Sequence, residues 1–197
     1  MTVRERFHSG TPTLSYELFP PRSAEAEETL WMTYERLATT DPDFFSVTYG
    51  AAGSTRDRSL GVVETLLESS PVPVVAHVTL VGASRAELAN VIEKYLDKGA
   101  RDFLALRGDP PEGQETWSPH PEGLQYASEL VSLIRDVARG YGADDVSVGV
   151  TAFPTQHADS RQRMGALDVL RAKQEAGADF AITQVFHEHD QLSLIHI

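Results

Sequence analysis

The chain has 197 residues, of which 41% are hydrophobic and 23% charged, a composition that can bury a core and is not that of a disordered chain. It carries 29 acidic and 17 basic residues, for a net charge of -12, which argues against a nucleic-acid-binding protein. It has no cysteine, so disulfides, thiolate catalysis and cysteine-ligated metals are excluded.

No apolar run approaches the roughly 20 residues of a membrane span. The N-terminal residues also lack the apolar stretch of a signal peptide. These features predict a soluble, cytoplasmic protein without nucleic-acid or membrane partners, and they fit one domain over residues 1–197.

Short runs rich in Val, Phe and Thr alternate along the chain with longer helical patterns, which is typical of βα units around a parallel sheet. We predict strands at Leu14–Phe19, Phe44–Tyr49, Val74–Thr79, Phe103–Leu106, Val146–Thr151 and Phe180–Gln184. We predict helices at Ala24–Ala38, Ser59–Glu68, Arg85–Asp97, Leu124–Arg139 and Arg161–Glu175. Ser84 and Glu87 form a predicted capping box, and Gly99 and Gly177 sit where helix ends need a positive φ.

Most strands alternate between an apolar and a polar face. In the third strand Ala76 and Val78 alternate with His77, and we assign Leu104 and Leu106 to the apolar face of the fourth strand. A doubly wound sheet, covered on both sides, favours apolar residues on both faces. One apolar and one polar face instead suits a barrel whose apolar face lies under the helices.

The number of units is smaller than a full barrel needs. The six predicted strands and the helices between them occupy the 197 residues, whereas a (β/α)8 barrel has eight units in roughly 250 residues. We therefore predict an α/β fold of the (β/α)8 TIM-barrel type that is truncated after about six βα units. Gln184 shares its parity with Ile182, which departs from the alternation.

Two segments carry candidate chemistry. Glu17 lies on the polar face of an apolar strand, and a carboxylate buried there would hold its proton to a higher pH, as a general acid near neutral pH requires. The alternative is an ordinary ion pair with a lysine or arginine. Arg107, Gly108 and Asp109 follow the fourth strand, where barrel active sites are built, and the alternative there is a capped turn before Pro110.

Three further features are weaker signals. The glycines of Thr48–Ser54 could cradle a phosphate, although the segment is neither a P-loop nor a dinucleotide-binding fingerprint. His77, in the middle of a strand, is of the kind that is usually a hydrogen-bonded core residue. His187–Asp190 offers metal-ligand types without a demonstrated third ligand, so we predict no metal site.

Five segments together resemble the methylenetetrahydrofolate reductase family. They are SYELFPPR at 15–22, FFSVTYGAAGSTRDRS at 44–59, AHVTL at 76–80, ALRGDPP at 105–111 and AITQ at 181–184, and their order matches across residues 14–186. The resemblance implies a (β/α)8 barrel that binds FAD. It also implies reduction of the small-molecule folate substrate, 5,10-methylenetetrahydrofolate, to 5-methyltetrahydrofolate, with the choice between NADH and NADPH as reductant left open.

The resemblance further implies roles for individual residues. Glu17 matches the family's catalytic acid, which protonates the folate so that its five-membered ring opens and can accept a hydride from reduced flavin. Asp109 matches an aspartate that contacts folate beside the flavin, and Gln184 matches a glutamine that hydrogen-bonds the pterin. The positions that match flavin contacts are Thr48, Tyr49, Ala51, His77, Arg107, Gly108, Asp109, Tyr126, Ala127, Phe153, His157 and Lys173.

Another interpretation stays open beside the reductase. The chain could be an inactive barrel fragment that binds flavin or folate, or associates with an intact subunit, without turnover. An aldolase-type barrel is disfavoured because none of the predicted strands ends in a lysine suited to a Schiff base. The oligomeric state, homo-oligomer or not, is left open.

Overall fold

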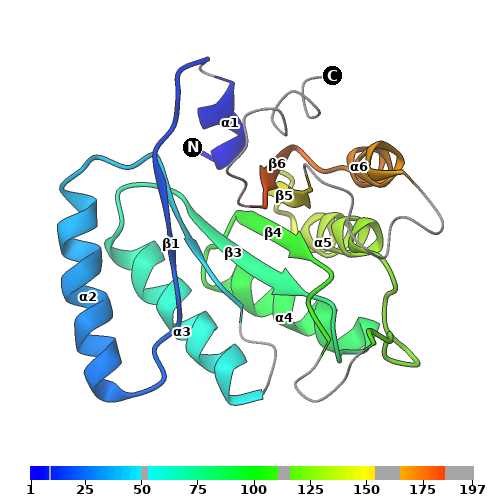
Figure 1. Ribbon diagram of the computed structural model, residues 1–197, viewed down its shortest axis with the longest axis horizontal. Coiled ribbons are helices and arrows are strands. Elements are labelled where there is room, and N and C mark those ends of the chain that lie inside the picture. The colour runs from blue at the N-terminus through cyan, green and yellow to red at the C-terminus, as the bar shows by residue number, and fades with distance from the viewer. Residues whose placement is uncertain (9, 50–52, 111–115, 154–164, 185–197) are drawn as a thin grey trace.

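The computed structural model describes residues 1–8, 10–49, 53–110, 116–153 and 165–184, with the backbone alone for 53–56 (Figure 1). Strands and helices alternate through this part of the chain. The strands are β1 (Ser15–Leu18), β2 (Phe44–Val47), β3 (Val74–Thr79), β4 (Asp102–Leu106), β5 (Ser147–Ala152) and β6 (Phe180–Thr183). The helices are α1 (Val3–Phe7), α2 (Ala24–Ala38), α3 (Gly53–Ser69), α4 (Arg85–Asp97), α5 (Ala127–Tyr141) and α6 (Ala166–Glu175).

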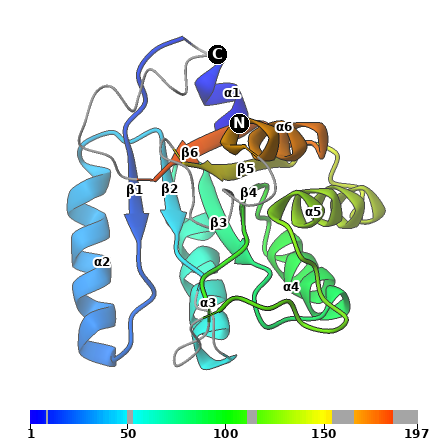
Figure 2. The same cartoon turned by 45° about the vertical axis from the view of Figure 1, so that its right-hand side comes forward.

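The strands form one parallel sheet in chain order, with each strand paired to the next. Figures 1 and 2 show α2 to α6 on one side of this curved sheet, as right-handed βα crossovers require. The α/β class and the order of the βα units are therefore confirmed, and the strands form a half-barrel. Closure into an eight-stranded barrel stays a prediction.

The helix-facing side of the sheet holds the main hydrophobic core. Phe45, Ala76 and Phe103 come from neighbouring strands and are fully buried in one cluster with Leu88 and Ile92 of α4. Helices α2 to α6 cover this side, and α1 covers only the beginning of the strands on the inner side, so the inner side can carry polar groups where the strands end. The predicted alternation of apolar and polar faces is thus confirmed for β2 and β3.

The assignment of faces is wrong for β4. Leu104 and Leu106, expected under the helices, lie on the inner side in a second cluster with Phe44 and Val75, while Phe103 packs under the helices. The inner side is apolar near the beginning of the strands, so apolar residues on a strand do not by themselves identify its helix side.

The same inner cluster explains why the polar Gln184 shares its strand face with the apolar Ile182. Phe180 and Ile182 of β6 pack against this cluster, so a residue of the same parity belongs to the inner side. Phe180 pairs with Gly149 of β5, and a Cβ at Gly149 would lie 2.4 Å from Phe180 Cε2. A bare glycine on β5 therefore makes room for the aromatic ring.

Helix α1, absent from our sequence prediction, closes the end of the sheet where the strands begin (Figure 2). Val3 is fully buried, and its backbone N–H donates to Asp102 Oδ1 at 2.7 Å. The ring of Phe7 packs against Phe44 and Phe180, with centroids 5.9 and 5.3 Å apart. Five residues are too few to show helical periodicity, which is why the pattern of apolar residues does not indicate this helix.

The other helix signals hold with small shifts at the ends. Ser84 caps α4, with Glu87 completing the capping box, and Gly99 and Gly177 have φ of 91° and 107°. Helix α3 begins at Gly53, earlier than predicted, and the predicted start of the last helix at Arg161 lies outside the described residues. Within the described ranges, no helix is both long and apolar enough to cross a membrane.

Candidate active site

Three side chains from successive strands meet on the inner side of the sheet, near the ends where the strands finish. Thr48 Oγ1, just after β2, donates to Glu17 Oε1 of β1 at 2.6 Å. His77 Nδ1 of β3 lies 3.9 Å from the same oxygen. The register pairs Glu17 with Ser46, two residues before Thr48, so the Glu17 side chain extends along the sheet to reach Thr48 and His77. Parity turns all three side chains to the same side of the sheet. The structure therefore brings together three residues predicted for the site.

His77 is the buried member of this group. Its side chain is 6% exposed, and its Nε2 has no hydrogen-bond partner in the described part of the chain. Burial lowers the pKa of His77 to about 4, against an opposing effect of the nearby Glu17 carboxylate. The imidazole is thus neutral at pH 7 and holds one polar atom ready for a ligand, which differs from the satisfied core histidine considered above.

Glu17 is less buried than its strand pattern suggested. Its side chain is 48% exposed, because β1 has a neighbour on only one side in the described sheet. The expectation of a buried carboxylate is wrong for this half-barrel. Of its two oxygens, Oε1 faces Thr48 and His77, and Oε2 has no partner among the described residues.

The turn after β4 is built around a glycine. Gly108 has φ of 84°, and a Cβ there would lie 2.7 Å from Val81 Cγ1 and 3.2 Å from Thr79 Cβ. A side chain at position 108 would therefore clash with the end of β3. The guanidinium of Arg107 lies over the ring of Trp117, 5.0 Å from its centroid, an aromatic partner that no motif in the sequence indicated.

A buried cation lies farther along the sheet. Lys173 of α6 is 7% exposed, and its Nζ donates to the backbone carbonyl of Thr151 at 2.6 Å. Burial, aided by the positive charge of Arg107, lowers the pKa of Lys173 to about 8. The lysine remains largely charged at pH 7. Arg107 and Lys173 are therefore close enough to influence each other, and together they can attract an anion.

Other predicted site residues have no described contact with Glu17, Thr48 or His77. Tyr126 precedes α5 and is exposed, and Ala127 is its buried first residue. Asp109 and Gln184 are exposed just beyond β4 and β6.

Phe153 follows β5, and Tyr49 is buried in the helix-facing core. Ala51 and His157 lie outside the described residues, as does the His187–Asp190 segment.

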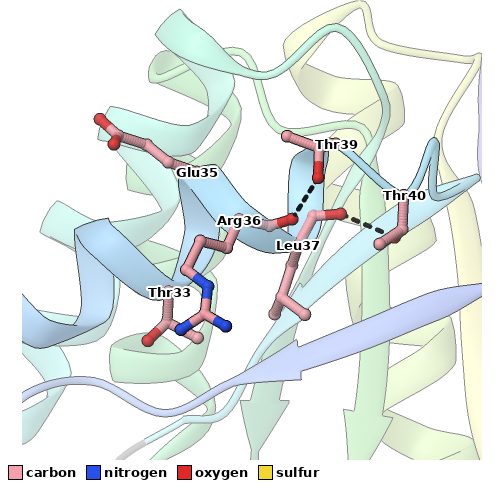
Figure 3. A pocket seen from close by; sticks show the side chains of 6 residues that line it. All are labelled: Thr33, Glu35, Arg36, Leu37, Thr39 and Thr40. Atoms are coloured by element: carbon pink, nitrogen blue, oxygen red, sulfur yellow. Dashed lines mark hydrogen bonds between the residues drawn. The ribbon is translucent and has the colours of Figure 1, made fainter.

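A hollow on the surface lies elsewhere, at the C-terminal end of α2 (Figure 3). Two of its hydroxyls already donate to backbone carbonyls at the helix end, Thr39 Oγ1 to Arg36 and Thr40 Oγ1 to Leu37, both at 2.7 Å. Glu17 precedes the opposite end of this helix. The hollow is therefore separate from the candidate site.

Comparison with known proteins identifies the family to which this chain belongs. Residues 2–195 match the family described as "Methylenetetrahydrofolate reductase". The chain belongs to the methylenetetrahydrofolate reductase family. This result confirms the resemblance that five short segments carried.

Curated members of the family match most of the chain. It is 38% identical over 179 residues to a 5,10-methylenetetrahydrofolate reductase of Pectobacterium carotovorum subsp. carotovorum, and 37% identical to that of Escherichia coli (strain K12). Each alignment covers 91% of this chain and 56% of the relative, so the chain spans just over half the length of these relatives. It is 32% identical to "Methylenetetrahydrofolate reductase (NADH) 1" of Zea mays, covering 95% of this chain and 32% of the relative.

Solved structures support the fold alone. Oxaloacetate acetylhydrolase in complex with oxalate superimposes with a TM-score of 0.67 at 12% identity, covering 98% of this chain and 66% of that one. A 2,3-dimethylmalate lyase superimposes with a TM-score of 0.64 at 15% identity, covering 99% and 67%. At these identities the likeness says how the chain folds and nothing about its substrate.

Proposed function

We propose that this protein acts in the reduction of 5,10-methylenetetrahydrofolate to 5-methyltetrahydrofolate, with Glu17 as general acid, FAD as cofactor and NADH or NADPH as reductant. Family membership supports the reaction, since curated relatives carry the name of this reductase. The observation on which the site assignment depends is the convergence of Thr48 and His77 on one carboxyl oxygen of Glu17.

This arrangement suits proton donation by Glu17. The bond from Thr48 Oγ1 and the approach of His77 Nδ1 hold the carboxyl group from the Oε1 side. Oε2 is then the atom from which a proton passes to the folate amine. His77 stays neutral at pH 7 because its pKa is about 4, so it does not remove that proton.

The described residues fit a bound FAD. His77 Nε2 is buried without a partner among the described residues, and Gly108 lets the turn after β4 pack against Thr79 and Val81 at the end of β3. Arg107 and Lys173 supply positive charge for phosphate oxygens. When bound, FAD supplies hydride transfer between the nicotinamide and the one-carbon unit. Asp109 and Gln184, both exposed at the ends of their strands, are proposed to hold the folate.

The test uses the chain extended at its C-terminus by the last two βα units of the Escherichia coli relative, here named the completed chain. We expect it to bind FAD, with the visible spectrum of a bound flavin. Glu17→Gln keeps the shape of the side chain and removes the proton, so folate reduction should slow by about 10²- to 10⁴-fold. Reduction of the flavin by the nicotinamide should be nearly unchanged, as stopped-flow absorbance at the flavin band would show.

A matched control separates chemistry from loss of charge. Glu28→Gln makes the same change at an exposed position of α2 and should leave both half-reactions at wild-type rates. Equal slowing of both half-reactions by Glu17→Gln would instead assign Glu17 a structural role. A completed chain that neither binds FAD nor reduces the folate would favour the alternative of an inactive barrel.

A further inference from the structure

A second unpartnered polar atom lies on the inner side of β3, beside His77. Thr79 is 6% exposed, and its Oγ1 has no hydrogen-bond partner among the described residues. Thr79 and His77 are two residues apart on one strand, so their side chains point to the same side of the sheet. The resemblance places His77 at a flavin contact and gives Thr79 no role.

The position of Thr79 is set by the turn after β4. Thr79 pairs with Leu106, the last residue of β4, and the backbone N–H of Leu80 donates to the carbonyl of Leu106 at 3.1 Å. Gly108 then folds over the end of β3, where a Cβ on it would lie 3.2 Å from Thr79 Cβ. Thr79 is therefore enclosed between two positions, 77 and 108, that the resemblance assigns to the flavin.

A buried hydroxyl without a partner is an unusual choice at such a place. Burying it removes its hydrogen bonds to water, and valine has almost the same shape without that penalty. The strand uses valine at three other positions, Val74, Val75 and Val78. The retained hydroxyl thus points to a partner that is not part of the described chain.

We propose that Thr79 Oγ1 hydrogen-bonds the isoalloxazine ring of FAD, which makes Thr79 a cofactor-binding residue of this site. This inference rests on the proposed function. A threonine hydroxyl both donates and accepts, so it suits a ring edge that offers N–H and carbonyl groups. The phosphates are better served by the cations Arg107 and Lys173 than by a neutral hydroxyl.

The ring is also the part of the cofactor that must come close to Glu17. Hydride transfer would act on the one-carbon unit of the folate, and proton donation on the amine nitrogen bonded to that carbon. His77 lies 3.9 Å from Glu17, and Thr79 follows it by two residues, about 7 Å along the strand. A ring near Glu17 can therefore reach both His77 and Thr79.

Three variants of the completed chain test this contact. Thr79→Val removes the hydroxyl and keeps the shape, Thr79→Ser keeps the hydroxyl, and Thr65→Val makes the same replacement at an exposed position of α3. FAD binding is measured by quenching of flavin fluorescence. The visible spectrum of the bound flavin and the melting temperature of the FAD-free protein are recorded for each variant.

We expect Thr79→Val to raise the Kd for FAD by about 2- to 10-fold, as loss of one buried hydrogen bond does. The same change should shift the visible bands of the bound flavin and leave the melting temperature of the FAD-free protein unchanged or higher, because an unpartnered hydroxyl has been removed. Thr79→Ser should restore affinity and spectrum, and Thr65→Val should match the wild type.

The other outcomes overturn the inference in distinguishable ways. An unchanged Kd in Thr79→Val, with FAD bound normally by the wild type, removes Thr79 from the flavin site and leaves the proposed function intact. A weaker affinity with an unchanged spectrum overturns the assignment to the ring. A wild-type completed chain that binds no FAD overturns the cofactor assignment itself, and the role of Thr79 falls with it.

Discussion

Gly149 shows how one missing side chain shapes the inner side of the sheet. A Cβ built at this position would lie 2.4 and 2.5 Å from Phe180 Cε2 and Cζ, so the ring or the strand would have to move. We predict that Gly149→Ala lowers the free energy of unfolding by about 1–3 kcal/mol, the usual effect of overpacking a core. Urea unfolding of the completed chain, followed by circular dichroism, measures this change.

The control is a glycine with open space around it. Gly61 is exposed on α3 and no atom lies within 4 Å of a Cβ built there. Gly61→Ala should therefore raise the free energy of unfolding by about 0.5–1 kcal/mol, because alanine is the better helix former. Equal effects of the two substitutions would contradict the steric argument for Gly149.

Residue identities predicted part of the candidate site and missed another part for physical reasons. Glu17 stood out as a carboxylate on an apolar strand, whereas Thr48 and His77 were assigned to the site only through the family resemblance. The structure shows that the three side chains lie together. Trp117 and Thr79 gave no comparable signal. Their significance depends on what lies against them, a guanidinium for Trp117 and bare backbone for Thr79, and such contacts across strands leave no local pattern.

At the scale of elements, α1 is held by a buried charge. Val3 N–H donates to Asp102 Oδ1 at 2.7 Å, and Ser147 bonds the same carboxyl group. Burial nevertheless raises the pKa of Asp102 from 3.8 to about 6, against the opposing effects of these bonds and of the N-terminal amine. The charged form is thus less stable in the folded protein than in the unfolded chain.

This shift predicts how stability changes with pH. A raised pKa in the folded state stabilises the fold below about pH 4 and loses that contribution as pH rises through about 6, by about 3 kcal/mol at most. Asp102→Asn keeps an acceptor for Val3 N–H and has no proton to lose. We expect the variant to remove the fall in unfolding free energy between pH 4 and 6 that this carboxyl causes.

Urea unfolding of the completed chain at several pH values measures the difference between Asp102→Asn and the wild type. Asp144→Asn, at an exposed position, serves as the control and should follow the wild-type pH dependence. An Asp102→Asn curve parallel to that of the wild type would show that this carboxyl does not titrate in the predicted range.

The elements themselves were largely predictable, because each has a local cause. Alternating side chains and short apolar runs place β3 at Val74–Thr79 in both prediction and structure, and the capping box places the start of α4. Which side of β4 faces the helices was not predictable in this way. That choice depends on α1, which is distant from β4 in the sequence and packs over the inner cluster.

In the molecule as a whole, the two outer strands, β1 and β6, determine how strongly we expect chains to associate. β1 and β6 each have one neighbour in the described sheet, which leaves backbone N–H and C=O groups unpaired along their other sides. Leu14 and Phe19, which flank β1, are 42% and 66% exposed, and Met32 on α2 is 54% exposed. Unpaired edges beside apolar side chains favour association between chains.

We therefore predict that residues 1–197 alone aggregate or unfold partly, and lack turnover although Glu17, Asp109 and Gln184 are present. A few hundred Å² of wet apolar surface, at roughly 25 cal/mol per Å², amounts to several kcal/mol. Whole-domain stability is only about 5–15 kcal/mol, so that loss is decisive. Sedimentation velocity, thermal melting and folate turnover would compare the 197-residue chain with the completed chain. A monodisperse 197-residue chain that melts cooperatively and turns over folate as fast as the completed chain would contradict both this prediction and the eight-stranded barrel from which it follows.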